Sequence, residues 1–389
     1  MNRFIPLLAI TSACMAPDVN DAFTTLELFV EDNAEDANAH VIALLDAAEN
    51  SAYISLPAGS DTQLTDAILA TWDRGIDVEV TTDYDQVIVP DAELDTRPPD
   101  EGLVELIEAG VPVQLADAAV EYFDFSIKND VSWTSQQVIM SDAMVIVDDT
   151  RLVNASHLGD TLEGHRVVFN VTSEDLGADL SLEHNQLFGG ADATSLTAFS
   201  NMQKSIADNR WLYRTQSGLD LEVWLGPQER LTKRIIDAVY GARSSIRILT
   251  NDFANEGLTQ ALEAKATHGF SVQVIVGPKL RGSNSALSRF FENDTPNVDK
   301  VQVTAFERIP TIVLIDEDEA RDGTTYPSRA FILSHDLYSA ARLYKDQEVI
   351  SDQLLDGNLW VLNDFTSDSP EIATLRALWD TYYSVGGAL

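Results

Sequence analysis

Apolar and polar residues follow the same order twice along the chain. The segment from Leu64 to Asp83 aligns without gaps with the segment from Leu258 to Gly277, each residue matching one 194 positions later. Within this alignment Gly75 falls on Gly269 and the flanking apolar residues keep their spacing. A repeat of this length indicates a structural unit that occurs twice in one chain.

Each copy has the pattern of alternating strands and helices. Apolar residues alternate with polar ones in the strand segments and recur at helical spacing between them. In the first copy we expect elements near residues 26–30, 42–45, 53–56, 60–75 and 76–80. The second helix should begin at Ser60, which has capping-box spacing to Gln63, and end at Gly75. Strand, helix, strand, helix, strand predicts parallel pairing with crossover helices, hence an α/β sandwich in each half.

The repeats divide the chain into four parts. Residues 1–22 precede the first repeat, which spans 23–190, and the second repeat spans 215–389. Between them, the segment 191–214 has the spacing of an amphipathic connecting helix after the break "FGGAD".

The composition limits the partners of the protein. Its 389 residues carry 25 Lys+Arg against 63 Asp+Glu, a formal charge of −38. Nucleic acids are bound through lysines and arginines that displace counterions, and no basic cluster stands out here. We therefore expect no nucleic-acid partner. Solubility, or adaptation to a saline habitat, accounts for the acidity.

The N-terminus has the outline of a secretory signal, with one arginine, a short apolar run and small residues before Cys14. Thr11-Ser12-Ala13-Cys14 resembles the lipobox of bacterial lipoproteins, which implies lipidation of Cys14, a membrane tether and a place in the bacterial cell envelope. A buried N-terminal strand with an incidental cysteine is the alternative. Since the chain has one cysteine, it forms no internal disulfide.

Downstream of the repeated unit, both halves run strand, acidic turn, strand, Ser-His. The first reads "VIMSDAMVIVDDTRLVNASHLGD" and the second "RIPTIVLIDEDEARDGTTYPSRAFILSHDLYS". These segments resemble the phospholipase D superfamily, in which each half carries His-x-Lys, four residues and Asp, followed by a Gly-Ser-x-Asn strand. The resemblance covers residues 24–379 and implies two fused α/β sandwich repeats related by pseudo-twofold symmetry, whose motifs meet in one central site.

The chemistry of that motif is missing from both copies. Asp148 and Asp316 stand at the aspartate positions, but the first copy has Ser141 and Ala143 where the family has histidine and lysine. The second copy has Ile309 and Thr311 at those places. In the family, one histidine attacks phosphorus, the other protonates the leaving oxygen, and the lysines hold the phosphoryl oxygens. We therefore predict a pseudoenzyme that binds or scaffolds, with an unknown protein or anionic small-molecule ligand.

A shifted site is the alternative. Ser156-His157 and Ser334-His335-Asp336 occupy matching places, and the two histidines could act as base and acid of a phosphodiesterase or phospholipase, or hold a metal with Asp336. Histidines inherited from the family and hydrogen-bonded in a pocket are the plainer interpretation. The spacing of the other histidines (His40, His165, His184 and His268) supports no metal site, and no cofactor-binding motif is present. No metal or cofactor is expected.

Overall fold

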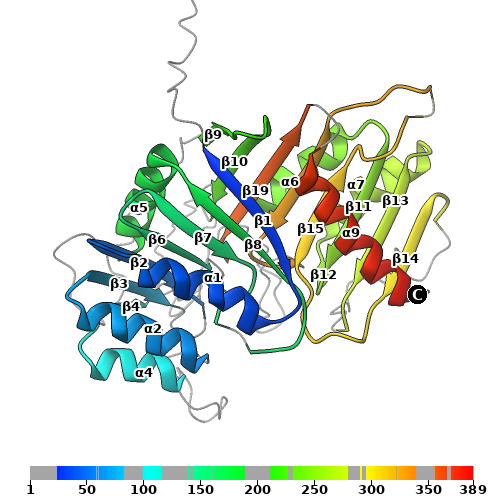
Figure 1. Ribbon diagram of the computed structural model, residues 1–389. Helices are drawn as coiled ribbons and strands as arrows, with labels where there is room; N and C mark the ends of the chain where they lie inside the picture. The colour runs from blue at the N-terminus through cyan, green and yellow to red at the C-terminus, as the bar shows by residue number, and fades with distance from the viewer. Residues whose placement is uncertain are drawn as a thin grey trace, which may run out of the picture.

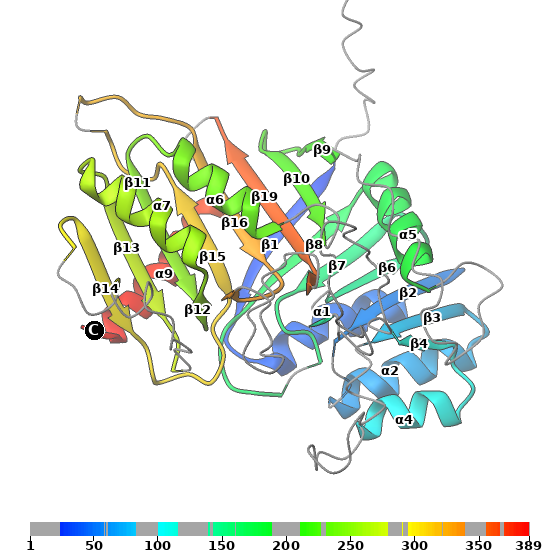
Figure 2. The same cartoon turned by 180° about the vertical axis from the view of Figure 1, so that it is seen from behind.

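The computed structural model describes residues 24–57, 59, 61–82, 100–115, 139–140, 143–159, 161–188, 211–226, 231–278, 290, 295–320, 322–338, 355–365 and 369–388. Two mixed sheets lie beside each other, each with helices packed on it (Figures 1 and 2). No helix in these ranges is long and apolar enough to cross a membrane.

The first half contains a seven-stranded sheet in the order β1-β8-β7-β6-β2-β3-β4. The elements of this half are β1 (Thr25–Glu31), α1 (Ala34–Asp46), β2 (Ser51–Leu56), α2 (Thr62–Asp73), β3 (Asp77–Thr82), α4 (Glu101–Glu108), β4 (Val113–Leu115), β5 (Ile139–Met140), β6 (Met144–Val147), β7 (Arg151–Ala155), β8 (Arg166–Thr172) and α5 (Glu174–Phe188). Strands β2, β3 and β4 are parallel, and the remaining neighbours in this sheet are antiparallel.

The second half contains a nine-stranded sheet in the order β20-β14-β13-β11-β15-β16-β19-β10-β9. Its elements are β9 (Trp211–Arg214), β10 (Asp220–Leu225), α6 (Leu231–Gly241), β11 (Ser245–Thr250), β12 (Phe253–Ala254), α7 (Glu256–Thr267), β13 (Ser271–Val276), β14 (Val298–Gln302), β15 (Thr311–Ile315), β16 (Ser328–Leu333), β17 (Leu337–Tyr338), β18 (Leu355–Asp356), β19 (Asn358–Asp364), α9 (Pro370–Val385) and β20 (Gly387–Ala388). From β14 to β10 the order repeats that of the first sheet from β4 to β1, so the predicted duplication is confirmed.

One sequence prediction about the elements is wrong, and a second is wrong over its last four residues. The first strand of each copy does not join the parallel set: β1 pairs antiparallel with β8, and β10 with β19, at the other side of the sheet. The pattern identified these strands but held no information about their neighbours. Of the predicted connecting helix at 191–214, only the last four residues are described, and they form the strand β9, where Leu212 is exposed and Tyr213 buried, the two-residue period of a sheet. Residues 191–210 lie outside the described ranges.

The repeated helices end as predicted and begin slightly differently. Gly75 and Gly269 both have positive φ, 79° and 85°, and each donates its N–H to the last turn of the helix before it. The cap of α2 is Asp61, whose carboxylate accepts from the N–H of Leu64, one residue later than the predicted Ser60. Asn255 does the same for α7, so the two copies share this cap position.

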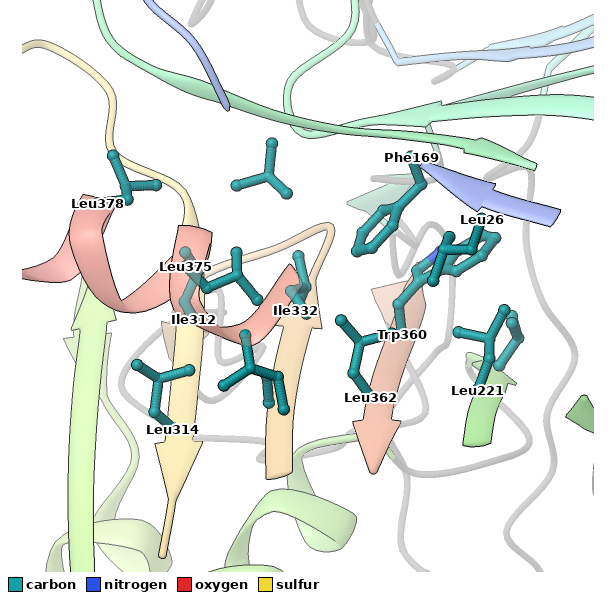
Figure 3. Packing of buried hydrophobic residues seen from close by; sticks show 14 of the residues in the cluster. Leu26, Phe169, Leu221, Ile312, Leu314, Ile332, Trp360, Leu362, Leu375 and Leu378 are labelled. Atoms are coloured by element: carbon teal, nitrogen blue, oxygen red, sulfur yellow. The ribbon is translucent and has the colours of Figure 1, made fainter. Parts of the chain in front are cut away.

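A continuous apolar core joins the two halves. It contains inward-facing residues of both sheets together with residues of α5 and α9. Each sheet has a separate core on its outer face, which α1, α2 and α4 cover in the first half and α6 and α7 in the second. Phe169 of β8 and Trp360 of β19 stack at 5.0 Å between ring centroids (Figure 3). The two strands have the same place in their sheets, so equivalent positions meet at the pseudo-twofold axis.

Candidate functional site

The two motif aspartates are bound to the backbone of their own halves. The Asp148 carboxylate accepts from the N–H groups of Asn50 and Ser51 at 2.7 and 3.2 Å, in the turn between α1 and β2. The Asp316 carboxylate accepts from the N–H groups of Arg243 and Ser244 at 2.6 and 2.7 Å, in the turn between α6 and β11. These contacts satisfy donors in a turn, which is a common use of aspartate.

Both aspartates also adopt left-handed backbone, with φ of 52° at Asp148 and 63° at Asp316. Burial raises the pKa of Asp148, but the hydrogen bonds from the turn and from Arg151 outweigh it, so this pKa lies below its usual value. The two aspartate carboxylates thus fix the strand ends by binding backbone N–H groups of the neighbouring turns.

Three of the four positions that the resemblance assigns to histidine and lysine lie in the described chain, and all three are buried. Ala143 is 1% exposed, and its carbonyl accepts from the N–H of Ala155 and the side-chain amide of Asn154. Ile309 is fully buried in the core that joins the halves. Thr311 is 1% exposed. Ser141, like Cys14, lies outside the described residues.

The two serines occupy equivalent places and make equivalent bonds. Ser156 Oγ accepts from the N–H of Val167 at 2.9 Å, and Ser334 Oγ accepts from the N–H of Asn358 at 2.8 Å. The N–H of Ser156 donates in turn to the carbonyl of Val167, and the N–H of Ser334 to the carbonyl of Asn358. Each serine therefore joins the end of one strand to the beginning of the next.

The two histidines differ in environment. His157 is half-buried with left-handed backbone, φ 60°. His335 is 4% exposed, and burial lowers its pKa to about 4. Neither ring nitrogen of His335 has a hydrogen-bond partner among the described residues. A histidine in this state is neutral and lacks a group to orient it, which disfavours a role as general acid or base at neutral pH.

Thr311 and Asp336 are brought together in a buried polar network. Thr311 Oγ1 lies 3.3 Å from the Asp336 carboxylate and 3.1 Å from Thr250 Oγ1, and the N–H of Asn251 donates to Asp336 at 3.2 Å. Burial raises the pKa of Asp336 to about 6, with a further contribution from the charge of Asp252. The positive charge of Arg308 and the hydrogen bonds act in the opposite direction.

Among the described residues, this network is present in the second half and has no counterpart in the first. At equivalent places the second half has polar residues and the first half apolar ones, in the pairs Thr250/Leu56, Asn251/Pro57, Thr311/Ala143, Asp336/Leu158 and Asn358/Val167. The buried charge at the second site is a carboxylate, where a phosphate-transferring site needs cations. Within the described ranges, no group of three or more His, Cys, Asp or Glu side chains is placed to hold a metal.

Two members of this network, Thr250 and Asn251 at the end of β11, were not among the residues predicted from the sequence. The signal was present in the repeats, because both residues replace apolar residues of the first copy. A position-by-position comparison of the two halves finds them.

Comparisons with known proteins support the fold. No protein-family model matches the sequence, and no curated protein shows significant similarity to it. Among solved structures, phosphatidylserine synthase of Haemophilus influenzae Rd KW20 matches with a TM-score of 0.64 at 12% identity, covering 95% of this chain and 88% of its own. Polyphosphate kinase from Porphyromonas gingivalis matches with a TM-score of 0.55 at 8% identity, covering 92% of this chain and 50% of its own. Nuc from Salmonella typhimurium, a phospholipase D family member, covers 44% of this chain and 98% of its own, with a TM-score of 0.33 and 14% identity.

The synthase match extends over nearly the full length of both chains, and the repeated strand order accounts for its two halves. At this identity the match concerns the fold. The chain has the duplicated α/β fold of the phospholipase D superfamily, as the sequence resemblance predicts.

Proposed function

We propose that this chain is a phospholipase D-like pseudoenzyme that binds or scaffolds and does not hydrolyse phosphodiesters. The observation that carries the proposal is the burial of Ala143, Ile309 and Thr311 where the family has its lysines and a histidine. None of these side chains supplies the imidazole or the positive charge that the family's reaction uses. Substituting a single residue would not restore the reaction, because such groups act as a unit.

The shifted site at His157 and His335 is the weaker hypothesis. It requires His335 to exchange protons with a substrate, whereas this ring is buried and its pKa is lowered to about 4. It also requires an activated nucleophile, whereas the nearby Ser334 already accepts a backbone hydrogen bond from Asn358.

An assay of the purified full-length protein separates the two. A chromogenic phosphodiester and phosphatidylcholine are the substrates, and wild type, His157→Ala, His335→Ala and His268→Ala are compared. His268 is an exposed residue just after α7 and serves as the matched histidine control. We expect no turnover above the buffer rate from any of the four. Turnover that disappears in the first two variants and persists in His268→Ala would replace this proposal by the shifted site.

We place the protein in the bacterial envelope, tethered through lipid on Cys14. The support is the lipobox-like sequence before Cys14. One acyl chain binds membranes marginally, so a firm tether needs more than one chain on the cysteine. Mass spectrometry of the N-terminal peptide from native cells tests this, with Cys14→Ser as control. A peptide that begins before residue 14, or an unmodified Cys14, would contradict the tether.

A further inference from the structure

The outer groove beside the first helix of each half is occupied in one half and open in the other. In the first half, His40 on α1 lies against Phe29, with 4.6 Å between ring centroids. Its Nε2 lies 2.8 Å from Glu31 and its Nδ1 3.0 Å from the amide of Asn170. These contacts join α1 to β1 and β8, so the groove on this side is filled by the protein's own polar side chains.

The second half has different residues at the same places. Arg234 on α6 corresponds to His40, and its guanidinium stacks on Trp224 at 3.2 Å from the ring centroid. Gly226 and Val361 stand where Glu31 and Asn170 stand in the first half. Neither offers a side-chain oxygen. The polar residues that occupy the first groove therefore have no counterpart in the second.

The arginines on the neighbouring strand differ as well. Arg151 of β7 is bound to Asp148 at 2.7 Å and to the carbonyl of Ala47 at 2.9 Å. Its equivalent on β16, Arg329, pairs across the strand with Ile315 as Arg151 pairs with Val147. Within the described chain, Arg329 forms no hydrogen bond or ion pair, and its guanidinium lies 5.6 Å from the ring of Phe331. An unpaired arginine is unexpected in a protein with 63 acidic residues.

A cavity of about 260 Å³ lies between α6 and the outer face of β10, β16 and β19, and its lining includes Trp224, Arg234, Arg329, Phe331 and Val361. Figure 2 shows α6 lying across this face of the second sheet. Two carboxylates are also present at its wall. Glu222 accepts from the indole N–H of Trp224 at 3.1 Å and from the amide of Asn363 at 2.9 Å. Asp237 is paired with Lys233. Both carboxylates thus have hydrogen-bond or ion-pair partners, whereas Arg329 has none among the described residues.

We propose that this groove binds a small molecule that carries an oxyanion, a carboxylate or a phosphate, against an apolar floor. Arg329 supplies the charge, which a carboxylate or phosphate can engage in two parallel hydrogen bonds, and Trp224 and Phe331 supply the floor. The volume lies just below the usual range of ligand sites, which restricts the ligand to a small one. The inference deepens the proposed binding function and places the anion away from the motif residues, where Asp336 and Asp252 are buried.

Titration of the purified full-length protein tests the proposal, with tryptophan fluorescence as readout because Trp224 lines the groove. Benzoate and inorganic phosphate are the anionic probes, and benzamide is the neutral match for benzoate. We expect benzoate or phosphate to change the fluorescence and benzamide to leave it unchanged. The probe that binds identifies the oxyanion as carboxylate or phosphate. Affinity should fall as ionic strength rises.

Three arginine variants make the test specific. Arg329→Gln should weaken binding at least about tenfold, since a hydrogen bond to a charged group is lost, while Arg329→Lys should retain part of the affinity. Arg151→Gln is the matched control and should bind like wild type, because the first groove is filled. Lack of binding by both anions at millimolar concentration, or equal affinity in wild type and Arg329→Gln, would overturn the proposal. Phosphodiester turnover that survives Arg329→Gln would instead count against the proposed function alone.

Discussion

Replacing Asp316 should destabilise the whole protein, because this residue binds the turn that leads into the central strand of the second sheet. Two turn N–H groups, of Arg243 and Ser244, lose a charged acceptor in Asp316→Ala. Hydrogen bonds to charged groups contribute about 1.5–3 kcal/mol each. Arg243 is exposed and its N–H can return to water, so the lower value applies and the two bonds contribute about 3 kcal/mol.

The backbone adds a second cost. At φ 63°, backbone strain destabilises the alanine variant by about 1 kcal/mol, and aspartate and asparagine largely avoid this strain. We therefore expect a loss of about 4 kcal/mol in the free energy of unfolding for Asp316→Ala and about 3 for Asp316→Gly, which relieves the backbone. Asp316→Asn keeps a neutral acceptor and should lose about 1–2 kcal/mol.

Urea unfolding followed by fluorescence and circular dichroism measures these differences. The apolar core joins both halves, so the two probes should report one transition. Asp148→Ala is the matched variant in the first half and should resemble Asp316→Ala. An alanine variant within 1 kcal/mol of wild type, or equal destabilisation by asparagine and alanine, would refute this role of Asp316.

Two further predictions concern proton uptake and the contact between the halves. Burial raises the pKa of Asp336 to about 6 and lowers that of His335 to about 4. As pH falls from about 6.5 to 4, the unfolded chain protonates this histidine first, which costs stability, while the folded chain protonates the aspartate first, which adds stability. Asp336→Asn removes the second effect, so its unfolding free energy should fall more steeply over this range than that of wild type; parallel curves in urea titrations at pH 7, 5.5 and 4 would contradict the assignment. Gly164→Ala would place a Cβ 1.9 Å from the carbonyl oxygen of Arg308 in the other half and should cost about 2–4 kcal/mol in thermal unfolding. Gly218→Ala, which also has positive φ but open space around it, should cost about 1 kcal/mol, and equal losses would show that the contact is unimportant.

The sequence predicts the fold well where local pattern and repetition agree. Gly75 and Gly269 end equivalent helices because a left-handed residue after a helix favours glycine wherever it occurs. The motif aspartates were identified by spacing, and their position at the strand ends follows from the apolar runs before them. The neighbour of β1 could not be predicted, because a period of two identifies a strand without identifying its partner.

The sites depended on contacts between distant segments. Thr311 and Asp336 are 25 residues apart, and the Asn251 that completes their network lies 85 residues from Asp336. The groove at Arg329 is formed by side chains of β10, β19 and α6, which lie far from it in the sequence. Comparing the halves residue by residue would have indicated it, since Arg151 and Arg329 align while their surroundings do not.

The stacking of Phe169 on Trp360 has a consequence for a half chain produced alone. Such a fragment would present its inner sheet face, with this aromatic residue at the centre, to water. Since one position faces its own equivalent across the axis, a second copy of the same fragment is already a fitting cover. A free half should therefore form homodimers that reproduce the intact architecture, and their dissociation constant would measure how far the two copies have diverged since fusion.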